Sequence, residues 1–183
     1  IFDEYRYFEP ASVFNVVHYK GKKIALTVCE DIWNVGNENP LYTICPLDEL
    51  KEQNPDFVLN LSASPFNYSH ANNRIHVLQS NIKLYGKPMF YVNHVGAQTE
   101  IIFDGGSIVM SPDGRVHDEL PYFEECIRSY ELSTVIEGGL HREQEKHKIT
   151  LIHDALITGI KDYFGKLGFK KAILGLSGGI DSA

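Results

Sequence analysis

The sequence has no apolar run long enough to cross a membrane, and it has few cysteines. A transmembrane helix needs about 18 or more consecutive apolar residues, and no stretch of the 183 residues approaches that length, so we expect no membrane partner. The three cysteines, Cys29, Cys45 and Cys126, stand far apart in no metal-ligand spacing. An odd number of dispersed cysteines fits a reducing compartment better than a disulfide framework. We therefore expect a cytoplasmic protein.

Positive charge is also scarce. The sequence has 17 Lys and Arg residues against 24 Asp and Glu residues, which gives a formal net charge of -7. Nucleic acids and anionic membranes attract basic surfaces, so we exclude them as main partners and keep small neutral or zwitterionic substrates. The first residues include neither an initiating Met nor a basic leader region, and we expect the chain to be cut from something longer.

Cys29 stands at the end of an apolar run and is followed at once by two carboxylates, Glu30 and Asp31. Such a run is typical of a buried strand, and nucleophiles often stand where a strand passes into a loop or helix. The competing interpretation is a cysteine that only packs in the core, because free Cys is among the most buried residue types. The local sequence leaves both interpretations open.

Strand and helix patterns alternate along the chain. The spacing of apolar residues and the turn residues predict these elements: strands at 12–19, 23–28, 57–61 and 88–93, helices at 47–53 and 72–85, and a hairpin whose turn spans 111–115. That order predicts an α/β layered domain. Beyond Gly138 the composition changes to a charged segment, which predicts a linker or the solvated start of a helix. A helix at 149–164 and a strand at 171–176 then begin a second unit.

A glycine-rich segment, Ser177-Gly178-Gly179-Ile180-Asp181-Ser182, follows that last strand. Two glycines let backbone N–H groups approach an anion, the serines add hydroxyl donors, and a helix starting here would turn its positive end to the ligand. The segment lacks the Gly-Lys-Ser/Thr ending of a Walker loop. A Gly-Gly turn alone is usually only a turn, but the six-residue pattern resembles the pyrophosphate-binding loop of the ATP pyrophosphatases.

Further segments extend the resemblance: Phe2-Asp3-Glu4 with Arg6 and Phe8, and the stretches 29–33, 62–66, 91–96 and 103–107. They resemble the nitrilase-like glutaminase half of the glutamine-dependent NAD synthetases, and the loop at 177–182 resembles the synthetase half. The resemblance implies an α/β fold with three parts. Residues 1–139 would form a nitrilase-like four-layer α-β-β-α sandwich, incomplete at its N-terminus. Residues 140–148 would form a linker, and residues 149–183 would begin a Rossmann-like adenylating domain.

The resemblance also implies a glutaminase site around Cys29, whose thiolate would attack the side-chain carboxamide of glutamine. A Glu base and an oxyanion-binding Lys are expected upstream of Ile1. Glu30 would not be the primary base, because adjacent residues on a strand point to opposite faces. Glu30 and Asp31 would orient the pocket, bind the substrate ammonium, hold the turn or serve structure alone.

Three further residues are implied to bind glutamine. Ser64 matches a position that contacts the substrate, although it could instead cap the turn before Pro65. His70 stands where the family usually has Lys, so that contact could pass to a backbone group or to Arg74. Arg74 could pair with the substrate carboxylate, although an Arg early in a helix is often only solvated.

The implied reaction converts deamido-NAD, ATP and glutamine to NAD, AMP, pyrophosphate and glutamate. The residues implied to hold ATP are Gly175, Leu176, Ser177, Gly178, Gly179, Ile180, Asp181 and Ser182. Mg²⁺ is expected with ATP because of its charge, and Asp181 could take part indirectly; no residue is assigned as a metal ligand, and glutamine hydrolysis itself needs no cofactor. The resemblance further implies a homo-oligomer.

Two other interpretations stay open. The Cys29 region alone permits a stand-alone carbon–nitrogen hydrolase, such as an amidase or a carbamoylase, although the loop at 177–182 argues against it. A chain without the catalytic Glu and Lys could also be an inactive scaffold. An assay for glutamine hydrolysis separates these interpretations.

Overall fold

The computed structural model describes residues 6–35, 44–138, 141–142, 144 and 147–182. Its strands are β1 Val17–Tyr19, β2 Lys22–Val28, β3 Phe57–Ser62, β4 Met89–Asn93, β5 Val95–Gln98, β6 Ile101–Asp104, β7 Ile108–Met110 and β8 Val116–Glu119. Its helices are η2 Cys29–Ile32, α1 Pro46–Glu52, α2 His70–Tyr85, α3 Leu132–Glu137, α4 Lys148–Leu167 and η4 Ile180–Ser182. The strand–helix alternation predicted from the sequence is confirmed through α2 and the strand that follows it.

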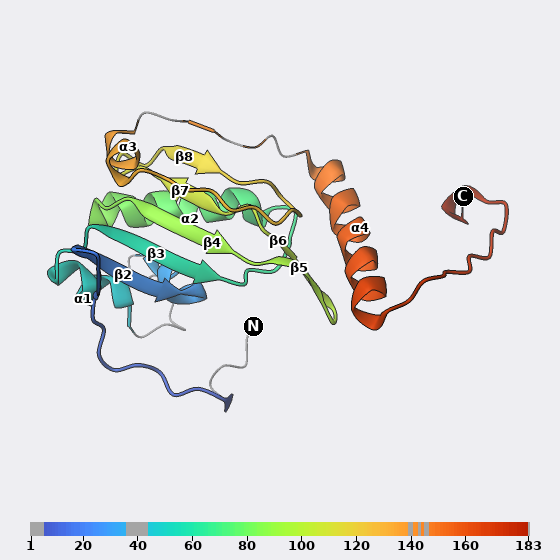
Figure 1. The fold of residues 1–183 in the computed structure, drawn as a ribbon, viewed down its shortest axis with the longest axis horizontal. Helices are drawn as coiled ribbons and strands as arrows, with labels where there is room; N and C mark the ends of the chain where they lie inside the picture. The colour runs from blue at the N-terminus through green and yellow to red at the C-terminus, as the bar shows by residue number, and fades with distance from the viewer. Residues whose placement is uncertain (1–5, 36–43, 139–140, 143, 145–146, 183) are drawn as a thin grey trace.

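Six strands form one mixed sheet in the order β1-β2-β3-β4-β7-β8 (Figure 1). The central strands β2, β3 and β4 are parallel neighbours, because crossovers through α1 and α2 return the chain to the same edge each time. The turn around residues 111–115 joins β7 to β8 as the predicted hairpin. The carboxyl ends of β2, β3 and β4 therefore meet at one edge of the sheet.

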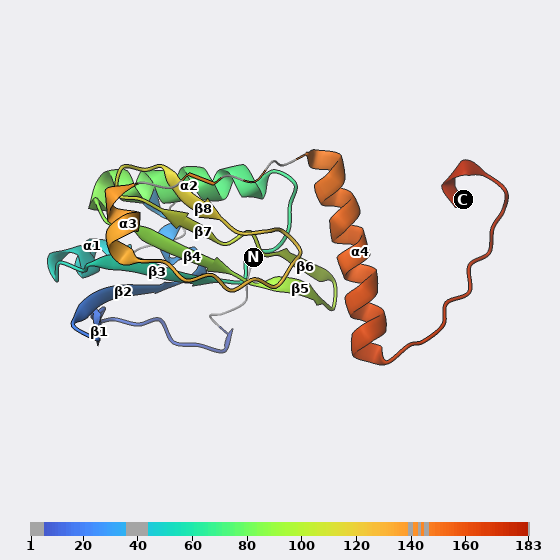
Figure 2. The same cartoon turned by 45° about the horizontal axis from the view of Figure 1, so that its top comes forward.

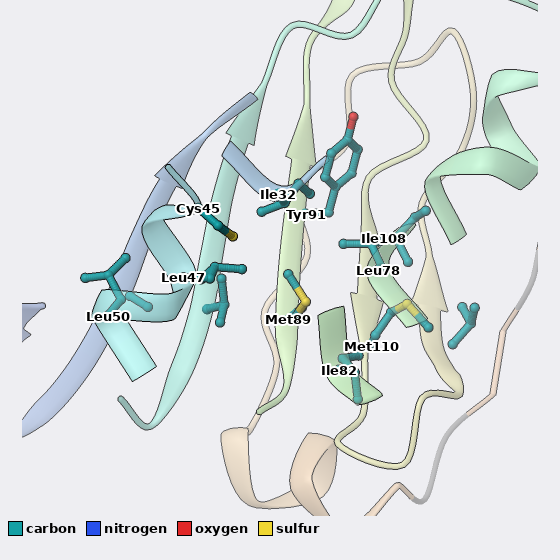
Figure 3. Close-up of a cluster of buried hydrophobic side chains, with 13 residues drawn as sticks. Ile32, Cys45, Leu47, Leu50, Leu78, Ile82, Met89, Tyr91, Ile108 and Met110 are labelled. Carbon is teal, nitrogen blue, oxygen red and sulfur yellow. The ribbon is translucent and has the colours of Figure 1, made fainter. Parts of the chain in front are cut away.

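Helices α1 and α2 cover one face of this sheet (Figure 2). The core between helices and sheet contains Ile32, Cys45, Leu47, Leu50, Leu78, Ile82, Met89, Tyr91, Ile108 and Met110 (Figure 3). In α2, Leu78 and Ile82 lie four residues apart and so project from one side of the helix. The helix ends at Gly86, whose φ of 64° is the left-handed conformation expected at a glycine stop.

The opposite face of the sheet is only partly covered by the described residues: β7 and β8 are buried throughout, and Phe90 of β4 packs against Tyr130 with 6.2 Å between ring centroids. Four apolar side chains on it are well exposed: Leu26 at 41%, Val28 at 61%, Leu61 at 45% and Val92 at 45%. A soluble sheet normally buries such a face against another layer. The described part of the chain thus forms one helix layer and one sheet layer, and these exposed apolar side chains mark the uncovered part of the other sheet face.

Helix α4 packs against a separate two-stranded hairpin formed by β5 and β6 (Figure 1). The Asp162 carboxylate accepts a hydrogen bond from the Ala97 backbone N–H at 2.6 Å, and Lys166 Nζ donates to the Ala97 carbonyl oxygen. At the other end of α4, Lys148 Nζ lies 4.0 Å from the centroid of the Tyr68 ring. The helix is therefore attached at two points to the domain that precedes it.

The segment after α4 differs from the prediction. Residues 171–176 do not form a strand, and every residue from 165 to 181 is exposed. Ile173 and Leu174 are 101% and 76% exposed. A strand needs a neighbouring strand to satisfy its backbone N–H and C=O groups, and none of the described residues pairs with this segment. The first predicted strand is also shorter than expected, since β1 begins at Val17 rather than at residue 12.

Candidate active site

Cys29 occupies a strained turn at the carboxyl end of β2. Its φ of 46° lies in the left-handed region, which non-glycine residues rarely adopt and which is often found at functional sites. The Asp31 carboxylate accepts a hydrogen bond from the Val28 backbone N–H at 2.8 Å, so Asp31 holds the turn. Burial raises the pKa of Asp31, and the hydrogen bond from Val28 opposes that effect. The half-buried Cys29 side chain remains reachable from solvent.

Glu30 follows Cys29 in a 3-10 turn and not in a strand. Cys29 and Glu30 therefore do not point to opposite faces of a strand, as we expected. Successive residues of a 3-10 helix are about 120° apart around its axis. Glu30 is half-buried. Its assignment as a pocket residue, and not the base, stays a prediction.

Asn60 connects the end of β2 to β3, and the sequence alone gave it no role. Its side-chain amide donates to the Cys29 carbonyl oxygen at 3.3 Å and to Thr27 Oγ1 at 3.0 Å. The Ser62 hydroxyl donates to Asn60 Oδ1 at 2.6 Å. The sequence does contain one indication of this role: Asn60 is a polar residue in the middle of an apolar strand. Buried polar groups almost always have hydrogen-bond partners.

Arg74 lies inside the protein and pairs with Asp104. Its Nη1 and Nη2 atoms donate to Asp104 Oδ2 and Oδ1 at 2.8 and 2.7 Å, and both side chains are at most 1% exposed. Burial alone would lower the pKa of Arg74, but the hydrogen bonds and charge of Asp104 raise it above its ordinary value. This internal pair favours a positioning role for Arg74; its contact with substrate stays a prediction.

Asn93 and Ser64 join this ion pair to the ends of the central strands. Asn93 Oδ1 accepts from the Ser64 backbone N–H at 2.9 Å, and Asn93 Nδ2 donates to the Gly105 carbonyl oxygen at 2.8 Å. Arg74 Nη2 donates to Ser64 Oγ at 3.3 Å. Asn93 thus links the Ser64 backbone to Gly105 and to Asp104. Contact of Ser64 with glutamine remains a prediction.

The structure leaves His70 and the first predicted motif largely undescribed. His70 is the first residue of α2, and its side chain lies outside the described part of the chain. The segment Phe2-Asp3-Glu4 also lies outside it. An open cavity of about 420 Å³ lies nearby, lined by Leu61 and Val92 of the open sheet face together with Asn93, His94 and Glu125. Cys29 does not line this cavity.

Residues 177–181 of the predicted phosphate loop are exposed. Gly178 has a φ of 82°, Gly179 N–H donates to Ser177 Oγ at 3.4 Å, and residues 180–182 form the short helix η4. No cluster of three or more His, Cys, Asp or Glu residues that could hold a metal occurs among the described residues. No helix in the described part of the chain is long and apolar enough to span a membrane. The ATP contacts of the loop stay predictions.

The sequence is similar over its whole length to known proteins. A family model described as NAD synthase matches residues 152–183. The glutamine-dependent NAD(+) synthetase of a Synechocystis strain is 38% identical over 194 residues, which cover 100% of this chain and 34% of that protein. The synthetase of an Acinetobacter baylyi strain is 34% identical, with 100% of this chain and 32% of that protein covered. The chain thus spans about a third of the length of these relatives.

Solved structures agree with the sequence comparison. The glutamine-dependent NAD+ synthetase from Acinetobacter baumannii, solved with ADP, matches 100% of this chain and 33% of its own, with a TM-score of 0.82 and 33% identity. A mutant of the amidase from Nesterenkonia sp. AN1 in complex with butyramide matches 64% of this chain and 41% of its own, with a TM-score of 0.51 and 25% identity. That amidase is described as a member of the nitrilase superfamily. The chain therefore has the fold of this part of the synthetases, including a nitrilase-like α/β domain.

Proposed function

We propose that this chain is part of a glutamine-dependent NAD+ synthetase, a ligase that hydrolyses glutamine and uses the ammonia to amidate ATP-activated deamido-NAD. The observation that carries the proposal is the match of the whole chain to such synthetases in sequence and in fold. The match joins a nitrilase-like domain to a segment similar to NAD synthase. A stand-alone amidase would account for the first part only.

Cys29 is the proposed nucleophile of the glutaminase reaction. Its Sγ adds to the carboxamide carbon of glutamine, the C–N bond breaks, and the nitrogen takes up a proton and leaves as ammonia. Water then cleaves the thioester to give glutamate and restore the thiol. The strained, solvent-reachable turn of Cys29 supports this role. The Glu base and the oxyanion-binding Lys are proposed to lie in sequence that precedes Ile1 in the longer protein.

The remaining pocket assignments follow from the geometry and the resemblance together. Ser64, His70 and Glu30 are proposed to face the glutamine. Arg74 is proposed to act through Ser64, because its two terminal nitrogens are both bonded to Asp104 and one of them also to Ser64. This arrangement would keep the Ser64 hydroxyl in one place while substrate binds.

The ATP site is proposed to use residues 175–182. The left-handed Gly178 and the backbone N–H groups beside it suit close approach of phosphate. Mg²⁺ commonly binds through one or two carboxylates together with substrate phosphates and water. The exposed Asp181 fits that limited requirement, and Mg²⁺ there would offset phosphate charge. Proposed boundaries are 1–139 for the glutaminase part, 140–148 for the linker and 149–183 for the start of the synthetase part.

Two broader features complete the proposal. Cys29, Cys45 and Cys126 form no disulfide with one another, which suits a cytoplasmic location. A homo-oligomer is proposed by resemblance.

Replacement of Cys29 tests the proposal in the full-length protein. We expect Cys29→Ala to lower glutamine hydrolysis and glutamine-dependent NAD synthesis by about a thousandfold or more, because the covalent route is lost. Synthesis with added ammonium chloride should stay within about twofold. Cys126→Ala is the matched control, since Cys126 is also a half-buried free cysteine, and it should keep both activities. Hydrolysis of unrelated amides but not of glutamine would instead identify a stand-alone amidase.

A further inference from the structure

The side chain of Tyr91 lies on the helix-covered face of β4, beside Asn60 of β3. Tyr91 is 1% exposed, and its register partner on β3 is Asn60, whose amide donates to the Cys29 carbonyl oxygen. Cross-strand partners lie side by side on the same face of a sheet. Figure 3 shows the Tyr91 ring directed away from Met89, with its hydroxyl at the end of the core nearest the carboxyl ends of the strands.

The Tyr91 hydroxyl has no hydrogen-bond partner among the described residues. Weak polar contact with the hydroxyls of Ser62 and Ser64 lowers the pKa of Tyr91, but neither contact has the geometry of a formed hydrogen bond. Ser62 donates to Asn60 Oδ1, and Ser64 Oγ accepts from Arg74. Buried hydroxyls are almost always paired, so this one is available to a molecule that enters the site.

The surroundings of Tyr91 keep its hydroxyl protonated. Burial raises the pKa of the phenol above its ordinary value, and the charge of Arg74 only partly opposes this. The negative charge of an ionised Cys29 acts in the same direction as burial. A protonated phenol donates a hydrogen bond, so an acceptor oxygen of a ligand is a suitable partner.

We propose that the Tyr91 hydroxyl is a further catalytic group, which donates a hydrogen bond to the carboxamide oxygen of the glutamine bound at Cys29. That oxygen gains negative charge as the Sγ–C bond forms, so a donor aimed at it lowers the barrier. The phenol keeps its proton throughout. This inference rests on the glutaminase function proposed above.

Tyr91→Phe tests the inference because it removes only the hydroxyl. We expect kcat/KM for glutamine hydrolysis in the full-length protein to fall by about ten- to a hundredfold, mainly through kcat. The urea midpoint of unfolding should stay the same or rise, because an unpaired buried hydroxyl contributes no hydrogen bond. The rate at which iodoacetamide alkylates Cys29 should stay within about twofold, since that displacement forms no oxyanion.

Tyr85→Phe is the matched control. The Tyr85 hydroxyl donates to Asp48 Oδ1 at 2.9 Å and lies 3.4 Å from Cys45 Sγ, away from the site. We expect this variant to lower the urea midpoint and to keep kcat/KM. The two tyrosine variants should therefore show opposite patterns of stability and activity.

The outcomes separate this inference from the proposed function. Wild-type kcat/KM in Tyr91→Phe would overturn the inference, provided that Cys29→Ala is inactive. A parallel loss of stability, alkylation and activity would also overturn it, because it would show that Tyr91 serves structure. If Cys29→Ala retained full glutamine hydrolysis, the proposed function would fail and this inference with it.

Discussion

The surroundings of Cys29 and the predicted phosphate loop are held in opposite ways. Around Cys29, hydrogen bonds between residues about 30 positions apart in the sequence join β3 to β2 and α2 to β6, and Asn60, Arg74 and Asp104 are fully buried. From residue 165 to residue 181 every residue is exposed, and residues 168–177 pair with no strand in the described part of the chain. The glutaminase side is thus organised by contacts within this chain, whereas the loop carries its glycine pattern on an unpacked segment.

This difference separates two ways in which a sequence encodes a site. The phosphate loop can be recognised from six consecutive residues, because phosphate would be bound by the backbone N–H groups of those residues. The Cys29 site needs partners from separate strands, which only the fold brings together. Substitutions in the two regions should therefore affect different properties.

Breaking the buried ion pair should have the largest effect. Asp104→Asn leaves the Arg74 guanidinium buried without its countercharge, and such changes cost about 3–5 kcal/mol of the free energy of unfolding. Urea denaturation of the full-length protein measures this loss. Asp113→Asn is the control, because the Asp113–Arg115 pair is exposed, with side-chain accessibilities of 39% and 61%, and should change stability by at most about 1 kcal/mol. Equal losses of unfolding free energy in the two variants would show that the buried ion pair is no more important for stability than the exposed one.

A substitution in the loop should have a smaller effect, limited to the ATP reaction. Gly178 has a φ of 82°, and an alanine there costs about 1–2 kcal/mol in the left-handed conformation. We expect Gly178→Ala to lower ammonia-dependent NAD synthesis about tenfold while glutamine hydrolysis is retained. Gly165→Ala, in α4 with open space around its Cβ position, should keep both activities. A loss of glutamine hydrolysis in Gly178→Ala would contradict independent behaviour of the two regions.

The smallest expected effect concerns pH and again involves the packed region. His117 is 2% exposed, and burial lowers its pKa although the charge of Asp118 opposes this. Below the ordinary pKa of about 6.5, His117 binds a proton in the unfolded chain but not in the folded chain. Its contribution to the free energy of unfolding is therefore fully present above a pH of about 6.5 and is lost as the pH falls below that value. Urea titrations between pH 8 and pH 5 give the free energy of unfolding at each pH. The slope of that free energy against pH should fall in His117→Gln by the amount that corresponds to at most about one bound proton. An unchanged slope would show that His117 charges freely in the folded state.

The sequence correctly predicted elements whose apolar residues have a clear period. It was wrong at 171–176, where a strand depends on partners elsewhere in the chain. Helix α2 and strand β3 appear almost as expected, because local patterns specify them. The strand expected at 171–176 has the right composition, but composition cannot supply a neighbouring strand.

The candidate site shows the same division. Cys29, Ser64 and Arg74 were predicted from the resemblance and stay predictions as site residues. Holding the turn was one of several roles left open for Asp31, and its hydrogen bond from the Val28 backbone N–H fits that role. The partners Asn60 and Asp104 received no role, because nothing in the local sequence links Arg74 to a carboxylate 30 positions later. Nor could the sequence show that Cys29 adopts a left-handed φ, since η2 lies against β2, β3, α1 and α2, which come from separate parts of the chain.

The attachment of α4 to Ala97 through Asp162 and Lys166 fixes the point at which the chain leaves that helix. A helix of 20 residues is a rod about 30 Å long. A tilt of about 10° at Lys148 would therefore move the far end of the rod by about 5 Å. The bonds to Ala97 hold that far end, so the spacing between the β5–β6 hairpin and the residues that follow α4 is set by the described part of the chain.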